Sequence, residues 1–105
     1  MTIKEFLEAL KKAKTVGYRP YLVSKPYGQT IRLKSPAGNE HCPITAVCEC
    51  QTGQTFPPAS VYSAIESLGL SPDDAYTIAT VADVHTAEPA LRQQILTALT
   101  LPEAE

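Results

Sequence analysis

A cluster of cysteine and histidine is the first group of side chains that could do chemistry. Cys42, Cys48 and Cys50 fall within nine residues, directly after His41. Thiolate and imidazole are good Zn²⁺ ligands, and four would complete a tetrahedral site. The spacing disfavours zinc, because structural sites usually pair ligands two to four residues apart, and Cys48 and Cys50 would point about 200° apart on a helix. We therefore expect buried thiols that pack as small hydrophobic groups, with no metal and no cofactor.

A reactive thiol is the alternative interpretation of this cluster. Cys42 directly precedes the expected start of a helix, and a helix N-terminus lowers the pKa of a thiol. A base would have to come from His41 or from the distant His85. Neighbours in sequence rarely align as nucleophile and base, so a small cysteine enzyme is the weaker hypothesis.

The acidic side chains are explained without catalysis. Asp73 and Asp74 lie in the first turn of an expected helix, where the helix dipole favours negative charge. Asp83 lies near the end of that helix, and we expect it to cap a turn or to bond to Arg92 or Arg32. The sequence has no Ser-His-Asp signature, phosphate loop or dinucleotide-binding fingerprint. These observations favour a protein that is not an enzyme.

The charges of the chain are unevenly distributed. Residues 1–34 hold eight of the nine basic side chains and two acids, whereas residues 35–105 hold Arg92 against nine acids. A separation of charge of this kind can attract a charged partner, or it can hold the basic and acidic halves of one fold together. The candidate partner-binding residues are the cations and tyrosines of the basic segment: Lys11, Lys12, Lys14, Arg19, Tyr21, Lys25, Tyr27, Arg32 and Lys34.

Three interpretations of this basic segment stay open. It could be a solvated surface that packs against the acidic half of the same molecule. It could bind nucleic acid, because cations interleaved with exposed Tyr18, Tyr21 and Tyr27 are typical of single-strand binding. The pI of about 5.6 argues against nucleic acid. An acidic protein partner is the third interpretation, since a two-stranded hairpin leaves an edge open for pairing.

The first third of the chain predicts a helix and a hairpin. Thr2 and Glu5 form a capping box, and apolar residues at helical spacing predict a helix over residues 3–15. Strand-forming residues flank the turn signal of residues 25–29, so residues 20–24 should pair with residues 30–34. Ile31 and Leu33 should face inward, with Arg32 and Lys34 in water.

The remainder predicts short helices. Pro43 favours a helix over residues 43–50 that closes near Gly53, and an apolar stripe at Val61, Ala64, Ile65 and Leu68 predicts another after the stiff linker of residues 55–58. Ser71 and Pro72 begin a helix over about residues 72–84, with Ala75, Ile78, Ala79 and Ala82 inward. A last helix over about residues 87–100 stops at Pro102, with Leu91, Ile95, Ala98 and Leu99 inward.

These elements predict a small α+β domain, mostly helical, with four to five short helices and one β-hairpin after the first helix. Residues 1–101 should form a single globular domain, and residues 102–105 a frayed tail. The chain has no apolar run that could span a membrane and no signal-peptide pattern. We therefore expect a cytoplasmic protein in a bacterial host cell.

Several short runs in the later part of the chain are distinctive when they are taken together. The most distinctive run is Cys42-Pro43-Ile44-Thr45-Ala46-Val47, and the others are Ile31-Arg32, Leu68-Gly69-Leu70, Asp74-Ala75, Ile78, Ala82-Asp83, Leu91-Arg92 and Ile95-Leu96-Thr97-Ala98-Leu99. Over about residues 30–100 this series resembles short proteins of tailed bacteriophages and prophages that have no known activity. The resemblance implies a phage accessory protein but supplies no functional residues.

We therefore expect a phage or prophage accessory protein that acts by protein–protein contact, inhibiting or redirecting a host factor such as a defence protein. The alternative is a small nucleic-acid-associated module that uses the basic N-terminal helix and hairpin. The expected partner is an unidentified host or phage protein, and no membrane is expected to take part.

Overall fold

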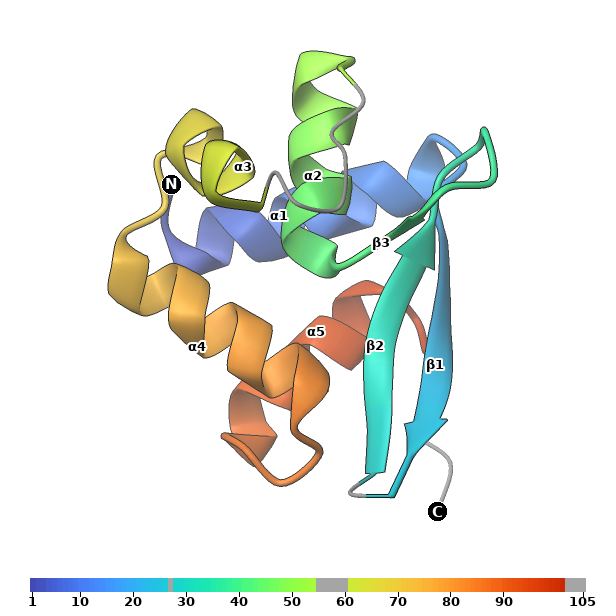
Figure 1. Cartoon of the computed structure of the whole chain (residues 1–105), viewed down its shortest axis with the longest axis vertical. Helices are drawn as coiled ribbons and strands as arrows, with labels where there is room; N and C mark the ends of the chain where they lie inside the picture. The colour runs from blue at the N-terminus through green and yellow to red at the C-terminus, as the bar shows by residue number, and fades with distance from the viewer. Residues whose placement is uncertain (27, 55–60, 102–105) are drawn as a thin grey trace.

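The computed structural model describes residues 1–26, 28–54 and 61–101. Within these residues the chain forms five helices and a three-stranded antiparallel sheet, with the sheet at one side of the helices (Figure 1). The predicted α+β class and the hairpin after the first helix are confirmed. In chain order the elements are α1 (Ile3–Thr15), β1 (Arg19–Lys25), β2 (Gly28–Lys34), β3 (Glu40–His41), α2 (Pro43–Thr52), α3 (Val61–Leu68), α4 (Pro72–Asp83) and α5 (Pro89–Ala98).

The predicted bounds and capping box of α1 are confirmed. The Thr2 hydroxyl accepts from the Glu5 backbone N–H, and the Glu5 carboxylate accepts from the Thr2 N–H. These two bonds satisfy backbone donors that the first helical turn leaves without partners. The bond that the carboxylate accepts from the Thr2 N–H also lowers the pKa of Glu5. Phe6, Leu10 and Ala13 form the buried stripe of the helix.

The hairpin is longer than the sequence predicted. β1 and β2 pair from Arg19↔Lys34 to Lys25↔Gly28. Lys25, Gly28 and Gln29, which we assigned to the turn, therefore belong to strands. The predicted alternation is confirmed at Ile31 and Leu33, which are fully buried, and at Lys34, which is exposed.

The sheet contains a strand that the sequence did not predict. Glu40 and His41 pair with Lys34 and Leu33, so β2 is the central strand in the order β1-β2-β3. A two-residue strand has no alternating pattern of its own. It forms because the turn at residues 35–39 directs the chain back along β2, with the Ser35 N–H donating to the Asn39 carbonyl.

The later helices form close to the predicted positions. α2 runs two residues longer than expected and ends at Gly53 in the left-handed region. α4 begins at the predicted Ser71 cap, whose hydroxyl accepts from the Asp74 N–H. α5 is shorter at both ends than predicted, because it begins at Pro89 and ends at Ala98.

One apolar core holds the elements together, because buried residues of all five helices and of β2 form a single cluster. Ala79 was predicted to face inward and is exposed, whereas Val81 is fully buried. The core-facing stripe of α4 is therefore formed by Ala75, Ile78, Val81 and Ala82. Spacing of three and four residues fits both sets, and packing against β2 and α5 selects the second.

The edge of β2 that faces away from β1 is covered near the hairpin turn by a buried arginine and the end of α4. Arg92, which is 2% exposed, donates from Nη1 to the Val81 carbonyl at 2.6 Å and from Nη2 to the Gln29 carbonyl. The Thr30 hydroxyl donates to the Asp83 carbonyl at 3.5 Å. Figure 1 shows α4 ending beside β2, on the side away from β1. We expected Asp83 to cap a turn or to bond to Arg92 or Arg32, and its carboxylate makes no ion pair with the described residues.

Several predictions concern residues outside the described ranges. These are Tyr27, the linker of residues 55–58, the stop at Pro102 and the tail of residues 102–105. Among the described residues, no helix is long and apolar enough to cross a membrane.

Candidate functional site

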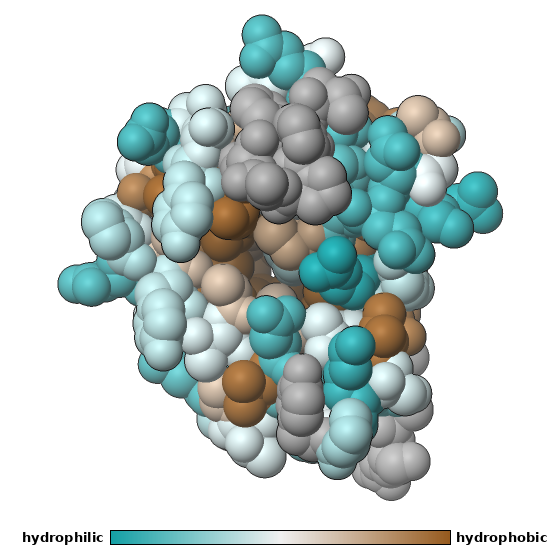
Figure 2. Space-filling view, in the orientation of Figure 1, coloured by the Kyte–Doolittle hydropathy of each residue, from teal (hydrophilic) through white to brown (hydrophobic). Residues whose placement is uncertain are grey.

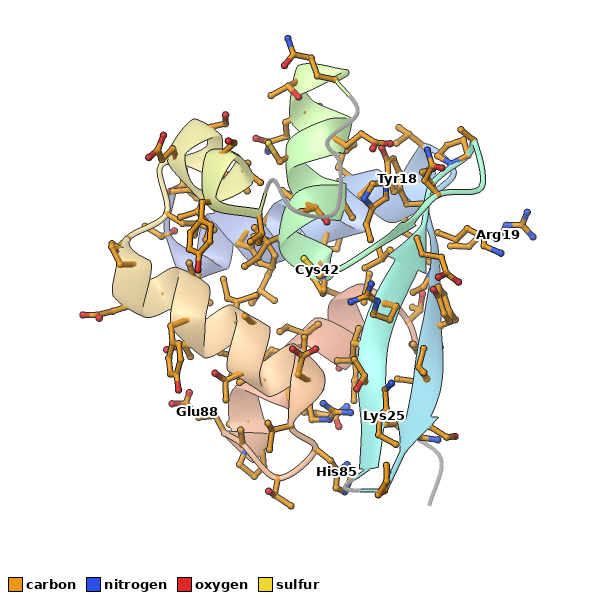
Figure 3. The ribbon with its side chains drawn as sticks, in the orientation of Figure 1. Tyr18, Arg19, Lys25, Cys42, His85 and Glu88 are labelled. Carbon is orange, nitrogen blue, oxygen red and sulfur yellow. The ribbon has the colours of Figure 1, made fainter. Side chains whose placement is uncertain are left out.

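The hairpin brings five of the nine candidate residues to one face of the sheet. Side chains alternate along a strand, and directly paired residues share a face. Arg19↔Lys34 and Tyr21↔Arg32 are such pairs, and Lys25 lies on the same side of β1. We call Arg19, Tyr21, Lys25, Arg32 and Lys34 the basic face. Figure 3 shows Arg19 reaching away from the helices at the start of β1, with Lys25 toward the other end of the hairpin.

The lysines of α1 lie outside this face. Lys12 and Lys14 are in the last turn of α1, and three residues separate the helix from β1. Lys11, Lys12 and Lys14 are all exposed. Lys11 lies beside Gln94 of α5 and Lys12 beside Gln51 of α2, so these lysines point to different sides of α1 and do not form one surface with the basic face. Within the basic face, Lys25 lies about 20 Å along the strand from Arg19. Tyr27 is outside the described residues.

Most of these cations have no carboxylate partner in the described chain. Lys11 pairs with Glu8 at 3.3 Å, and both side chains are more than half exposed, so the pair adds little stability. Lys12, Lys14, Arg19, Lys25, Arg32 and Lys34 make no ion pair with any described residue. Within residues 1–26, 28–54 and 61–101, the acidic half of the chain therefore makes no close ion pair with the basic segment.

The register even sets two cations side by side. Arg19 lies directly opposite Lys34 on the same face, and like charges in that position are destabilising. On its other side Lys34 faces Glu40 of β3. The Glu40 carboxylate also raises the pKa of the nearby Tyr21 hydroxyl.

Tyr21 is bound into this face and is half-buried. Burial raises the pKa of its hydroxyl, and the Glu40 carboxylate raises it further, whereas Arg32 lowers it. Tyr21 is therefore held among polar neighbours at the middle of the basic face. Tyr18 was expected to be an exposed aromatic, but it is 6% exposed and belongs to the interior.

The outer edge of β1 pairs with no segment of the described chain. Strand β1 pairs with β2 alone, and no other described segment forms a backbone hydrogen bond with residues 19–25. An unpaired strand edge can accept an additional strand. Pro20 lies within β1, at a position that only an edge strand tolerates well. The basic face therefore borders the free edge of the sheet.

The described cysteine and histidine side chains of residues 41–50 do not come together in one metal site. Among the described residues, no three His, Cys, Asp or Glu side chains are placed to hold a metal ion. Cys48 is fully buried, and burial raises the pKa of its thiol. Cys42 precedes α2 as predicted, half-buried, with its Sγ 3.4 Å from the Thr45 hydroxyl. Its reactivity stays a prediction.

His41 belongs to a buried polar group that the sequence did not predict. Its Nε2 lies 2.9 Å from Oε2 of Glu49, although the contact lacks the direction of a hydrogen bond. The Tyr18 hydroxyl donates to Oε1 of Glu49 at 2.8 Å. Burial, and then the Glu49 carboxylate, raises the pKa of Tyr18. His41 therefore presents this nitrogen to Glu49 rather than to the neighbouring Cys42 thiol.

Comparisons of the chain with protein-family models, with curated proteins and with solved structures find no match. The resemblance to phage proteins is therefore still a prediction.

Proposed function

We propose that this chain is a phage or prophage accessory protein that acts without catalysis, by binding a host or phage protein through the basic face. The observation that carries the proposal is the set of cations without carboxylate partners among the described residues, placed along an open strand edge. Retaining like charges opposite each other costs stability. An acidic ligand bound at this face would place negative charge beside these cations and offset that cost.

The partner that fits this surface is an acidic segment in extended conformation. Main-chain bonds to the edge of β1 would supply affinity, and carboxylates would meet the cations on the adjoining face. The charges would mainly speed the encounter and exclude basic competitors. A host defence protein or another regulatory factor that presents such a segment would be inhibited or redirected by losing access to it.

Site-specific photo-crosslinking in bacteria tests the proposal. A photoreactive amino acid replaces Val23, which is half-buried within β1, and a second version carries it at the exposed Gln94 of α5. We expect a protein adduct from the Val23 position that the Gln94 position does not give. The substitution Arg19→Glu should remove that adduct.

The same experiment distinguishes nucleic-acid binding from protein binding. An adduct that nuclease digests, together with binding that weakens steeply as salt is added, would favour nucleic acid. Equal adducts from Val23 and Gln94, or none from either, would count against the basic face as a binding surface.

A further inference from the structure

A second surface of this molecule has the character of a binding groove. It is a hollow of about 470 Å³ between α3 and α4, bordered by the start of α2. Its floor contains the buried side chains of Ile44 and Ala75 and the half-buried Val61 and Ile65. We call it the tyrosine groove. Figure 2 shows a hollow with apolar atoms in the region where α2, α3 and α4 meet in Figure 1.

Two tyrosines stand at the rim of this groove. Tyr62 of α3 is 78% exposed and Tyr76 of α4 is 74% exposed. They are the most exposed large hydrophobic side chains among the described residues. Tyrosine is enriched at protein interfaces, because it buries a large rigid ring while its hydroxyl keeps a polar contact. Neither ring is needed by the core of this molecule.

The charged side chains of the helices that form the groove have one sign. There is no Lys or Arg between Lys34 and Arg92, so α2, α3 and α4 carry no basic side chain. Glu66 lies in the groove wall, and Asp73 and Asp74 begin α4. A ligand with Lys or Arg beside its apolar anchors would therefore meet complementary charge, and an acidic ligand would be repelled.

The walls of the groove also limit the conformation of the ligand. Both walls are helices, whose backbone groups are already bonded within the helix, and the lining is largely apolar. An extended segment would find no strand edge here to satisfy its own N–H and C=O groups. The backbone groups of a helix are hydrogen-bonded within the helix itself, and its apolar side chains can enter such a groove.

We propose that the tyrosine groove binds an amphipathic α-helix of a protein partner, with Lys or Arg flanking its apolar face. A second copy of this chain does not fit, because the apolar faces of its described helices are used in its own core. This surface is separate from the basic face, and the two have opposite charge preferences.

Selection from a displayed library of helix-forming peptides tests the proposal. We expect the peptides that bind to share apolar residues at i, i+3 or i+4 and i+7, together with net positive charge. A synthetic version of the best peptide should bind at least about tenfold more weakly to Ala79→Arg, which fills the groove from an exposed position. Tyr76→Ala should weaken binding by a similar factor, and NMR shifts should map to α3 and α4.

Matched controls separate groove contacts from net charge and from the basic face. Ser63→Arg adds the same charge at an exposed position of α3 that does not line the groove, and Lys25→Glu alters only the basic face. Both should keep peptide affinity within about twofold. Circular dichroism confirms that each variant is folded.

Three results would overturn the inference. One is that no peptide is enriched on the native protein over Ala79→Arg. Another is that the enriched peptides are acidic or extended and rich in proline. The third is that the protein forms a dimer that Ala79→Arg converts to a monomer, which would assign the groove to a second copy of the chain.

Discussion

Arg92 shows at the level of one residue how the sheet is held against the helices. Its guanidinium donates to carbonyls of α4 and β2, two segments far apart in the sequence. A planar group with several donors in fixed directions can span two carbonyls, whereas an ammonium is a single point of contact. The lone basic residue of the acidic half therefore has a structural use.

We expect Arg92→Leu to lower the free energy of unfolding by about 2–4 kcal/mol, because two buried carbonyls lose a charged donor. Arg92→Lys should recover about half of that loss. Urea unfolding of the three proteins measures both values. A leucine variant as stable as the native protein would show that the arginine contacts contribute nothing.

The group formed by Tyr18, Glu49 and His41 gives a dependence on alkaline pH. The pKa of Tyr18 is raised in the folded protein, so the stability from its protonated form is complete below the ordinary value of 10.0. It declines as the pH rises above that value, because the unfolded chain then releases the proton more readily.

Tyr18→Phe should therefore have two effects. Near pH 7 the free energy of unfolding should fall by about 1–3 kcal/mol, since Glu49 loses its buried donor. From about pH 10 to about pH 12 the variant should lose stability less steeply than the native protein. Thermal unfolding across this range measures both, with Tyr62→Phe as an exposed control. Parallel pH curves for the native protein and Tyr18→Phe would contradict the role of Tyr18.

At the level of elements, the hairpin turn is docked on the loop between α4 and α5. Gly28 has a φ of +128°, and a Cβ at this position would lie 2.2 Å from the Cβ of His85. Figure 3 shows His85 beside the hairpin turn. Glycine is required here both by the backbone conformation and by the close approach of the loop.

Gly28→Ala should lower the free energy of unfolding by about 2 kcal/mol or more, through strain and overpacking together. The substitution His85→Gly removes the close contact but not the strain in φ. Gly28→Ala should therefore cost less free energy of unfolding when it is made in the His85→Gly variant than when it is made in the native protein. Chemical denaturation of the four proteins of this cycle gives the coupling. An alanine variant of native stability would show that the turn and the loop do not pack in this way.

Local signals account for the elements that were predicted well. The capping box of Thr2 and Glu5 and the Ser71 cap placed the starts of α1 and α4, because their bonds lie within a few residues of chain. The strand β3 and the register of the hairpin were missed, since both depend on pairing between segments. The inward position of Val81 instead of Ala79 likewise depends on which neighbours pack on α4.

The pairing of β1 with β2 also predicts a variant in which stability and binding change in opposite directions. Arg19→Glu converts a like-charge pair with Lys34 into an opposite-charge pair, so unfolding should cost about 0.2–1 kcal/mol more. The same change should weaken partner binding at the basic face. Thermal unfolding combined with the crosslinking yield measures both. Loss of both stability and binding would mean that the variant only damages the fold.

At the level of the whole molecule, the chain carries two surfaces of different character. The basic face and the lysines at the end of α1 come from the first third of the sequence, and the tyrosine groove comes from α2, α3 and α4. The charge separation that the sequence predicted therefore persists in the fold. A molecule arranged in this way can contact two partners, or two parts of one partner, without competition.

The sequence predicted the basic face but not the groove. The basic residues can be read directly from the sequence, and strand alternation predicted that Arg32 and Lys34 face water, but the observed register was needed to place Arg19, Tyr21 and Lys25 on the same face. Tyr18 was wrongly grouped with them, because burial of a tyrosine depends on a distant donor or acceptor such as Glu49. The groove had one local signal, since Tyr62 lies outside the apolar stripe of its helix, but its concave shape follows only from the packing of three helices.

The most direct test of the central claim is the affinity of the captured partner for a matched pair of charge reversals. Lys25→Glu alters the basic face, and Lys4→Glu makes the same change at an exposed position in the first turn of α1. We predict that Lys25→Glu weakens binding by about fivefold to tenfold and that Lys4→Glu changes it by less than about twofold. Equal losses from the two substitutions, or no loss from Lys25→Glu, would contradict the assignment of the binding surface to the basic face.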